Sequence, residues 1–265
     1  MSKSNQTQTV LITGATSGIG YELASIFAQV HYNLVLVARS EATLADVARH
    51  LKKQGAENVT VFPCDLSVQN SAEDVYMEMK NRGIEVDILV NNAGVGEHGL
   101  FQETNLKKEL AIIQLNIGTL VHLTKLFMHD MLDRNHGRIL QLASVASYQP
   151  TPLLAVYAAT KAFVLSFSDA VINELRNSKV TMTVMIPGPT DTDFFHKAGM
   201  DKTRAAHEKL ADPKEVAAIA YDALMRGDHH AFGPGAKTQA TISAVLPNEN
   251  VASKARKHME EKKDK

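Results

Sequence analysis

The chain has 265 residues, of which 45% are hydrophobic, and its 28 Lys and Arg residues nearly balance its 29 Asp and Glu residues. This length suits one α/β domain with a sizeable core, and the near-neutral charge gives no electrostatic reason to expect nucleic acid or a charged membrane as a partner. A single cysteine cannot form an internal disulfide and the 11 scattered histidines show no zinc-binding pattern, so we expect no metal.

The chain begins with a polar stretch, MSKSNQTQTV, that lacks the apolar core of a secretory signal. No later stretch has about 18 consecutive apolar residues, so no membrane segment is expected. Both observations predict a soluble, cytoplasmic protein.

Short apolar runs rich in β-branched residues alternate with longer helical patterns over most of the chain. The expected strands are 9–14, 32–38, 59–65, 87–92, 137–144 and 179–188, and the expected helices lie near 18–30, 41–54, 71–82, 105–134 and 154–177. This alternation is typical of a parallel sheet that is covered by helices on both faces. With right-handed crossovers, it predicts a Rossmann-type, doubly wound α/β fold in a single domain over residues 8–235.

The alternation breaks after Gly188. Residues 189–211 are polar and irregular, and because they follow the carboxyl end of a strand, where such sheets bind ligands, we favour a lid over the site to a plain surface loop. A helix should start near Asp212, with Pro213 in its first turn. After one more edge strand, residues 236–265 form a C-terminal extension with a short helix, and its charged end, KARKHMEEKKDK, is expected to be frayed.

A glycine-rich turn, TGATSGIG, connects the first strand to the first helix. Its glycines lack a Cβ, which allows a tight turn, close approach of the backbone to a pyrophosphate and close packing of helix on strand. The helix N-terminus adds unpaired N–H groups and the positive end of its dipole. The turn therefore predicts a dinucleotide site formed by Gly14, Thr16, Ser17, Gly18, Ile19 and Gly20.

The end of the second strand indicates which dinucleotide binds. A carboxylate there would accept hydrogen bonds from the ribose 2′-hydroxyl of NAD and repel a 2′-phosphate. This chain has Ala38 at that position, followed by Arg39 and Ser40, and a guanidinium with a hydroxyl suits a phosphate. We expect NADP to be favoured over NAD; the alternative is a solvent-exposed arginine without this function.

The segment AVYAATKAF places Tyr157 four residues before Lys161, and residues four apart share one face of a helix. A free tyrosine is too weak an acid–base group to act quickly near neutral pH, whereas a lysine charge nearby would favour its phenolate. Ser144, at the end of the strand 137–144, would emerge at the carboxyl edge of the sheet, where ligands bind, with Ser147 as a rival. From the residues alone, the tyrosine and lysine could also face the same way on a helix surface by coincidence.

These motifs resemble one family, the short-chain dehydrogenases/reductases. The resemblance rests on TGATSGIG, on NNAG at 91–94, on Asn116, on Ser144, on YAATK at 157–161 and on PGPTDT at 187–192. It covers about residues 8–225 and implies a single doubly wound domain that interconverts alcohols and carbonyls with NAD(P). It also implies roles for four residues: Tyr157 as general acid/base, Lys161 as its partner, Ser144 as the hydroxyl that orients the carbonyl, and Asn116 as the residue that holds a water in a proton relay.

The resemblance further implies a set of cofactor-binding residues beyond the glycine-rich turn. Asp65 and Leu66 would meet the adenine, Asn91, Ala93 and Gly94 would lie along the adenosine, Tyr157 and Lys161 would face the nicotinamide ribose, and Pro187, Gly188, Thr190 and Thr192 would hold the nicotinamide end. From the residues alone, two positions keep a second interpretation. Asp65 could cap the helix that begins near Ser71, and Asn116 could make an interhelical hydrogen bond without catalytic meaning.

The substrate should contact the segments that follow the motifs. These are residues 95–101, residues 145–154 and the lid, with Phe194, Phe195 and Met200. Their apolar content predicts a small-molecule substrate, a medium-sized and fairly apolar carbonyl compound or its alcohol. An acyl thioester, a steroid-like ketone and a small aldehyde all stay open. His98, in the first of these segments, could line the substrate cleft, but a solvated loop residue is favoured.

Two long helical patterns, 105–134 and 154–177, carry more apolar residues than one sheet face needs. A second apolar stripe can pair with another subunit, which predicts a homodimer or homotetramer. A catalytically silent dinucleotide-binding sensor or scaffold with the same fold is the alternative function. Such a protein would have no need of a proton donor aimed at the nicotinamide.

Overall fold

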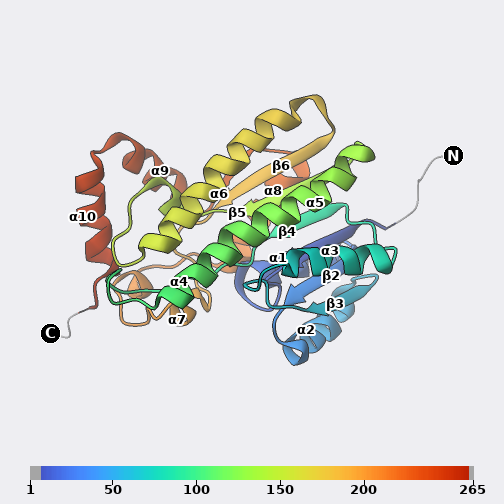
Figure 1. Cartoon of the computed structure of the whole chain (residues 1–265), viewed down its shortest axis with the longest axis horizontal. Helices are drawn as coiled ribbons and strands as arrows, with labels where there is room; N and C mark the ends of the chain where they lie inside the picture. Colours follow the sequence, from blue (N-terminus) through green and yellow to red (C-terminus); the bar gives the residue numbers. More distant parts are fainter. Residues whose placement is uncertain (1–6, 263–265) are drawn as a thin grey trace.

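The structure is a computed structural model that describes residues 7–262. Residues 1–6 of the polar start and residues 263–265 of the charged tail lie outside the described part of the chain. Seven parallel strands form one sheet in the order β3-β2-β1-β4-β5-β6-β7 (Figure 1). Their bounds are β1 Thr9–Thr13, β2 Asn33–Ala38, β3 Val59–Pro63, β4 Ile88–Asn91, β5 Gly137–Leu142, β6 Val180–Ile186 and β7 His230–Phe232. The predicted doubly wound sheet is confirmed.

The order of the strands reverses beside β1. The chain runs outward from β1 to β2 and β3 and then crosses back to β4 on the other side of β1. Ligands of doubly wound sheets bind at such a switch point, beyond the carboxyl ends of the strands. Val10, Leu11 and Ile12 of β1 are all fully buried, because helices cover both faces of the sheet.

Helices cover the sheet in two layers. One face carries α1 (Gly18–Gln29), α2 (Glu41–Gln54) and α8 (Pro213–Arg226), and the other carries α3 (Ser71–Asn81), α5 (Leu120–Asp133) and α6 (Ala155–Glu174). Phe27 and Leu224 are fully buried in the first layer, and Met79 and Met131 in the second. The α8 helix starts as predicted, since the Asp212 side chain accepts a hydrogen bond from the Lys214 N–H at 2.8 Å.

A single long helical run precedes β5. It consists of α4 (Leu106–Ile113), a π-helical turn over Gln114–Thr119, and α5, so the predicted helix 105–134 contains one π segment. Such π segments occur frequently at functional sites. By length and composition this run and residues 155–177 could each cross a membrane. In this fold both pack on the sheet, but only 39% and 33% of their most apolar stretches are buried, which leaves apolar surface uncovered.

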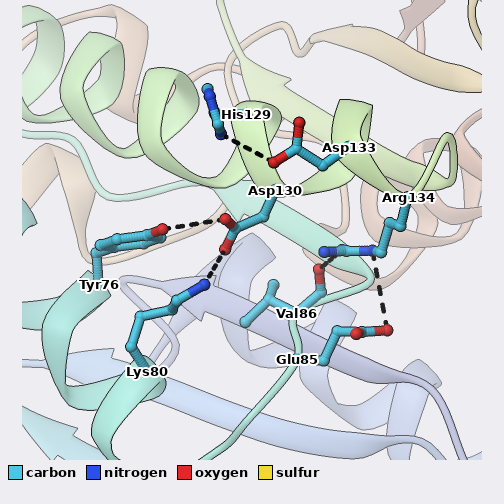
Figure 2. A network of polar contacts seen from close by, with 8 residues as sticks. All are labelled: Tyr76, Lys80, Glu85, Val86, His129, Asp130, Asp133 and Arg134. Carbon is cyan, nitrogen blue, oxygen red and sulfur yellow. Dashed lines mark hydrogen bonds and ion pairs between the residues drawn. The ribbon is translucent and has the colours of Figure 1, made fainter.

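Polar contacts near the C-terminal end of α5 hold the long run against its neighbours (Figure 2). The Asp130 carboxylate accepts hydrogen bonds from the Tyr76 hydroxyl at 3.0 Å and the Lys80 ammonium at 3.1 Å, both on α3. Arg134 donates to the Val86 carbonyl just before β4. The half-exposed ion pair of Lys80 and Asp130 contributes at most about 1 kcal/mol to the free energy of unfolding. The main effect of these polar contacts is therefore to set the position of α5 relative to its neighbours.

The C-terminal extension differs from the prediction. It forms α9 (Ala236–Val245) and α10 (Asn248–Met259), which lie at the left end of the molecule in Figure 1. The expectation of a frayed end is wrong for its described residues. Val251 and Ala255 of α10 are buried, and beyond the helix Glu261 pairs with Thr203 in an antiparallel bridge. The charge pattern of the sequence did not indicate that α10 packs on the protein, because the buried stripe of this helix is only one residue wide.

Candidate active site

A cavity of about 830 Å³ lies at the carboxyl ends of six neighbouring strands, β1 to β6. Its size is in the range of ligand-binding pockets. The cavity is lined along its length by the glycine-rich turn, the residues that follow β2 and β3, the end of β5, the start of α6 and the lid. Of the predicted cofactor-binding and catalytic residues, the cavity is lined by Gly14, Thr16, Ser17, Gly18, Ile19, Arg39, Ser40, Asp65, Leu66, Ala93, Gly94, Ser144, Tyr157, Lys161, Pro187, Gly188, Thr190 and Thr192.

The glycine-rich turn leaves no room for side chains at two positions. Gly14 has a φ of +66°, and a Cβ built there would lie 2.9 Å from Asn92 Nδ2. Gly18 has a φ of +56°, and its Cβ would lie 2.8 Å from Thr192 Cγ2 of the lid. Ser17 precedes α1 as its N-cap and makes no side-chain capping bond there, so the amides at the start of α1 face the cavity. Such a bare helix N-terminus fits a pyrophosphate.

The far end of the cavity holds Arg39, Ser40 and Asp65. Ser40 caps α2 by accepting a hydrogen bond from the Thr43 N–H at 3.3 Å. Asp65 Oδ1 accepts bonds from the N–H and hydroxyl of Ser67, at 3.0 and 2.7 Å. The Ser67 hydroxyl, with the nearby Arg39 charge as a weaker cause, holds the pKa of Asp65 below its usual value. Asp65 is therefore a carboxylate beside a guanidinium.

Three predicted catalytic residues meet at the other end. Tyr157 and Lys161 lie one turn apart on α6, and Ser144 follows β5. The Ser144 hydroxyl lies near enough to the Tyr157 hydroxyl to act on its pKa, and it accepts a hydrogen bond from the Ala146 N–H at 3.1 Å. Lys161 Nζ donates to the Leu142 carbonyl at 2.6 Å and lies 5.8 Å from the Tyr157 ring centroid. Ser147, the rival of Ser144, instead donates to the Lys161 backbone carbonyl at 2.8 Å, so it supports the helix.

The pKa values of this pair differ from the expected direction. Burial raises the pKa of Tyr157 to about 12, and the Ser144 hydrogen bond opposes the rise only in part. Burial also lowers the pKa of Lys161 to about 8. The lysine was expected to favour phenolate, but in the protein alone burial outweighs nearby groups, because removal from water penalises both charged forms. Tyr157 is therefore held protonated in the protein without cofactor.

Asn116 lies on the π-helical turn and is almost fully buried, with 1% of its surface exposed. Its Oδ1 accepts the Val95 N–H at 3.2 Å, and its Nδ2 donates to the Val95 carbonyl and the Thr160 hydroxyl at 3.1 and 3.0 Å. A Cβ built on Gly94 would be 3.4 Å from both Asn116 Oδ1 and Lys161 Nζ. The amide thus ties the loop after β4 to α6 beside the lysine, as the interhelical interpretation predicted, and its relay role stays a prediction.

A sequence profile of the short chain dehydrogenases matches residues 8–203, well over half of the chain. The chain belongs to the short-chain dehydrogenase family. It is therefore an NAD(P)-dependent oxidoreductase that acts on CH–OH groups. The motifs that carried the resemblance all fall within the matched residues.

Individual relatives support this membership. The chain is 31% identical to the ketoacyl reductase HetN of Nostoc sp. over 214 residues, 79% of this chain and 72% of that protein. It is 36% identical to an 11-beta-hydroxysteroid dehydrogenase of Pinus massoniana over 186 residues, 70% of this chain and 52% of that protein. A solved short-chain dehydrogenase from Sphingobium yanoikuyae in complex with NADPH is similar with a TM-score of 0.81 and 29% identity, covering 89% of this chain and 93% of that one.

Two predicted cofactor-binding residues of this short-chain dehydrogenase lie outside the cavity. Asn91 is buried under α5 and donates to Thr124 and Gln141 at 3.0 and 3.1 Å. Gly20 lies behind the turn, where a Cβ would be 2.4 Å from the Gly14 carbonyl, so it serves helix packing. In the described residues both positions support the cavity from behind its lining, and their contact with a cofactor stays a prediction.

Asn92 lines the cavity, whereas the preceding residue, Asn91, does not. Its Nδ2 donates to the carbonyls of Thr13 and Gly14 at 2.9 and 3.1 Å, which holds the glycine-rich turn open. Successive side chains of a strand point to opposite faces, so the alternation along β4 was the signal that could have separated the two asparagines.

The lid also supplies a cation that no motif predicted. Lys197 Nζ, on the short helix α7 (Phe194–Lys197), lies 3.4 Å from Ser17 Oγ and 3.2 Å from Asp193 Oδ2. Both the lysine and the serine line the cavity at the glycine-rich turn. In this short-chain dehydrogenase the lid therefore places a positive charge beside the glycine-rich turn. Within residues 7–262, no group of three or more His, Cys, Asp or Glu side chains could hold a metal ion.

Proposed function

We propose that the protein interconverts a medium-sized, apolar carbonyl compound and its alcohol with NADP(H), and that Tyr157 is the general acid/base. The observation that carries this proposal is that Ser144, Tyr157 and Lys161 line one end of the cavity whose other end is lined by the glycine-rich turn. The bound cofactor supplies or accepts the hydride.

The protein's own side chains handle the proton and the orientation of the substrate. Tyr157, kept protonated by its burial, donates its proton to the carbonyl oxygen during reduction and takes it back during oxidation. The Ser144 hydroxyl holds the same oxygen and thereby aims the carbonyl carbon toward the cofactor. Lys161, fixed by the Leu142 carbonyl, stabilises the negative charge that develops on the phenol oxygen.

A panel of aldehydes, ketones and alcohols tests this proposal, with NADPH or NADP⁺ followed by absorbance. A ketoacyl reductase and a hydroxysteroid dehydrogenase are among the relatives, so both acyl thioesters and steroid-like ketones belong in the panel. Turnover of at least one medium-sized apolar carbonyl compound is expected, since Leu154, Phe194 and Phe195 line the cavity near Tyr157. The absence of turnover across the panel would contradict the proposal.

The preference for NADP rests on Arg39, which lies exposed at the adenosine end of the cavity. A guanidinium contact to a 2′-phosphate is a charged hydrogen bond, so Arg39→Leu should weaken NADP binding roughly 10- to 100-fold. NAD binding should change little, because NAD lacks that phosphate. Dissociation constants for both cofactors measure the change, with Arg49→Leu, an exposed arginine of α2, as the matched control. Equal loss of both cofactors, or tighter NAD binding by the unaltered protein, would contradict the preference.

Assembly into a dimer or tetramer is proposed from the uncovered faces of α4 and α6. Leu106, Leu110 and Ile113 follow one face of α4 and are 68%, 56% and 40% exposed, and Phe163 of α6 is 40% exposed. Light scattering at micromolar concentration should therefore give at least a dimer. Leu110→Lys should shift the mass toward the monomer, whereas Val68→Lys, at an equally exposed position of 56%, should not. A monomer mass for the unaltered protein would refute this assembly.

A further inference from the structure

The C-terminal extension crosses the substrate end of the cavity. We propose that Met259, held there by the end of the chain, is a wall of the substrate pocket and limits the size of the carbonyl compound that fits beside Tyr157. This inference rests on the proposed function of the cavity and goes beyond it, since it names the residue that sets substrate size. Met259 and the helix that carries it lie outside the profile match, which ends at residue 203.

Helix α10 is polar except for one narrow stripe. Val251, Ala255 and Met259 are spaced four residues apart and so lie along one side of the helix. Val251 and Ala255 are each only 5% exposed. The stripe therefore packs inward, and its last member, at the end of the helix, lines the cavity.

The chain after α10 is paired with the lid. Glu261 and Thr203 form an antiparallel bridge, the Arg204 N–H donates to the Glu260 carbonyl at 3.1 Å, and the Lys262 N–H donates to the Lys202 carbonyl at 2.9 Å. These are backbone bonds, so they do not depend on the lengths of flexible side chains. They fix the residue before them, Met259, against the lid.

A second attachment joins Met259 to the loop after β4. His98 Nε2 lies 2.7 Å from the Met259 carbonyl oxygen, so the ring N–H donates to it. The His98 backbone N–H in turn donates to the Ala198 carbonyl of the lid at 2.9 Å. His98 is thus no solvated loop residue, contrary to the expectation. It holds the loop, the lid and the tail together at one point.

The Met259 side chain packs in the apolar cluster that contains the proton donor. This cluster consists of Leu154, Tyr157, Phe194, Phe195, Ala198, Met200 and Met259. Tyr157 and Phe194 have ring centroids 4.9 Å apart, and Met259 packs in the same cluster as these two rings. Methionine is unbranched and adaptable, and replacing it by alanine would leave space next to Tyr157 without a charge or a new polar group.

The first arm of the test asks whether Met259 lies in the cavity in solution. The chain contains no tryptophan, so Met259→Trp introduces a single fluorescent reporter. Its emission should be that of a buried indole, poorly quenched by acrylamide, and added NADPH should quench it by energy transfer. Met77→Trp, at an exposed methionine of α3 with 46% exposure, is the reference for a solvated indole. Solvated emission from both variants would overturn the proposal.

The second arm measures substrate size. With NADPH, kcat/KM is compared for acetophenone and for alkyl phenyl ketones with progressively longer alkyl chains. Met259→Ala should raise the ratio of kcat/KM for the long-chain ketones to kcat/KM for acetophenone roughly tenfold or more. This is the effect of one or two methylenes in an apolar pocket. Met77→Ala should leave the ratio unchanged. An unchanged ratio in Met259→Ala would overturn the size limit.

The two arms separate this inference from the function beneath it. If the unaltered protein reduces none of the ketones, the result counts against the proposed function for ketones of this class. The emission of the Met259→Trp reporter would still show whether Met259 lies in the cavity. Turnover with a solvated reporter would leave the function standing and overturn the role of Met259. A buried reporter with a shifted size ratio supports both.

Discussion

Replacing Tyr157 by phenylalanine is expected to reduce kcat for carbonyl reduction by about 10²- to 10⁴-fold, the usual contribution of a positioned proton donor. The change removes only the hydroxyl, which lies near Ser144 in the cavity. The aromatic ring and its contact with Phe194 are retained, with ring centroids 4.9 Å apart in the unaltered protein. Stopped-flow or steady-state absorbance of NADPH measures the loss.

Cofactor binding separates this role from a structural one. Because the glycine-rich turn and Arg39 lie at the other end of the cavity, the Tyr157→Phe protein should bind NADPH within a few-fold of the unaltered protein. Ser147→Ala is a matched control, since that hydroxyl bonds only the Lys161 backbone carbonyl among the described contacts. Unchanged activity in Tyr157→Phe would refute the assigned role and would favour a protein that binds the dinucleotide without turnover.

Replacing Lys161 by methionine is expected to lower kcat by at least about 100-fold, because the charge that stabilises the phenolate is removed. The substitution also leaves the buried Leu142 carbonyl without its 2.6 Å partner, so some loss of stability accompanies it. Thermal unfolding of the variant separates the two effects. A folded variant with full activity would contradict the role of the lysine.

The acid–base state of Lys161 also predicts a pH dependence. Burial lowers its pKa to about 8, so the ammonium is charged below that pH and loses its charge as the pH rises through about 8. Tyr157, with its pKa raised to about 12, stays protonated over the same range. The rate of carbonyl reduction should therefore fall above about pH 8. In Lys161→Arg, whose guanidinium stays charged, any remaining activity should lose this fall.

Most of the fold followed from local patterns. Buried parallel strands need continuous apolar runs, and the six predicted strands correspond to β1 through β6. The edge strand β7 has three residues, too few for periodicity to give its bounds. The sequence therefore predicted an edge strand beyond residue 230 without its exact residues. The glycine-rich turn and the spacing of Tyr157 and Lys161 were equally visible, because the chemistry depends on residues that are neighbours along the chain.

Other parts of the site required the folded chain. The partner of Asp65 is Ser67, and the N-cap of α3 is Asn70, so the helix-cap interpretation of Asp65 is wrong. The lysine of the lid that meets Ser17 is 180 residues away from it in sequence. Contacts between residues so far apart leave no periodic trace, and only the packing of the lid on the turn brings them together.

The sequence by itself determined the order of strands and helices and the family, and it located the glycine-rich turn and the tyrosine–lysine pair, because each depends on local spacing or on a short motif. Only the tertiary structure decided which asparagine faces the cavity, in which direction burial shifts the pKa values of Tyr157 and Lys161, and where the C-terminal extension lies. The pKa shifts needed the structure because desolvation depends on every atom around a group. The place of Met259 needed it because the chain after α10 pairs through its backbone with residues about 60 positions earlier.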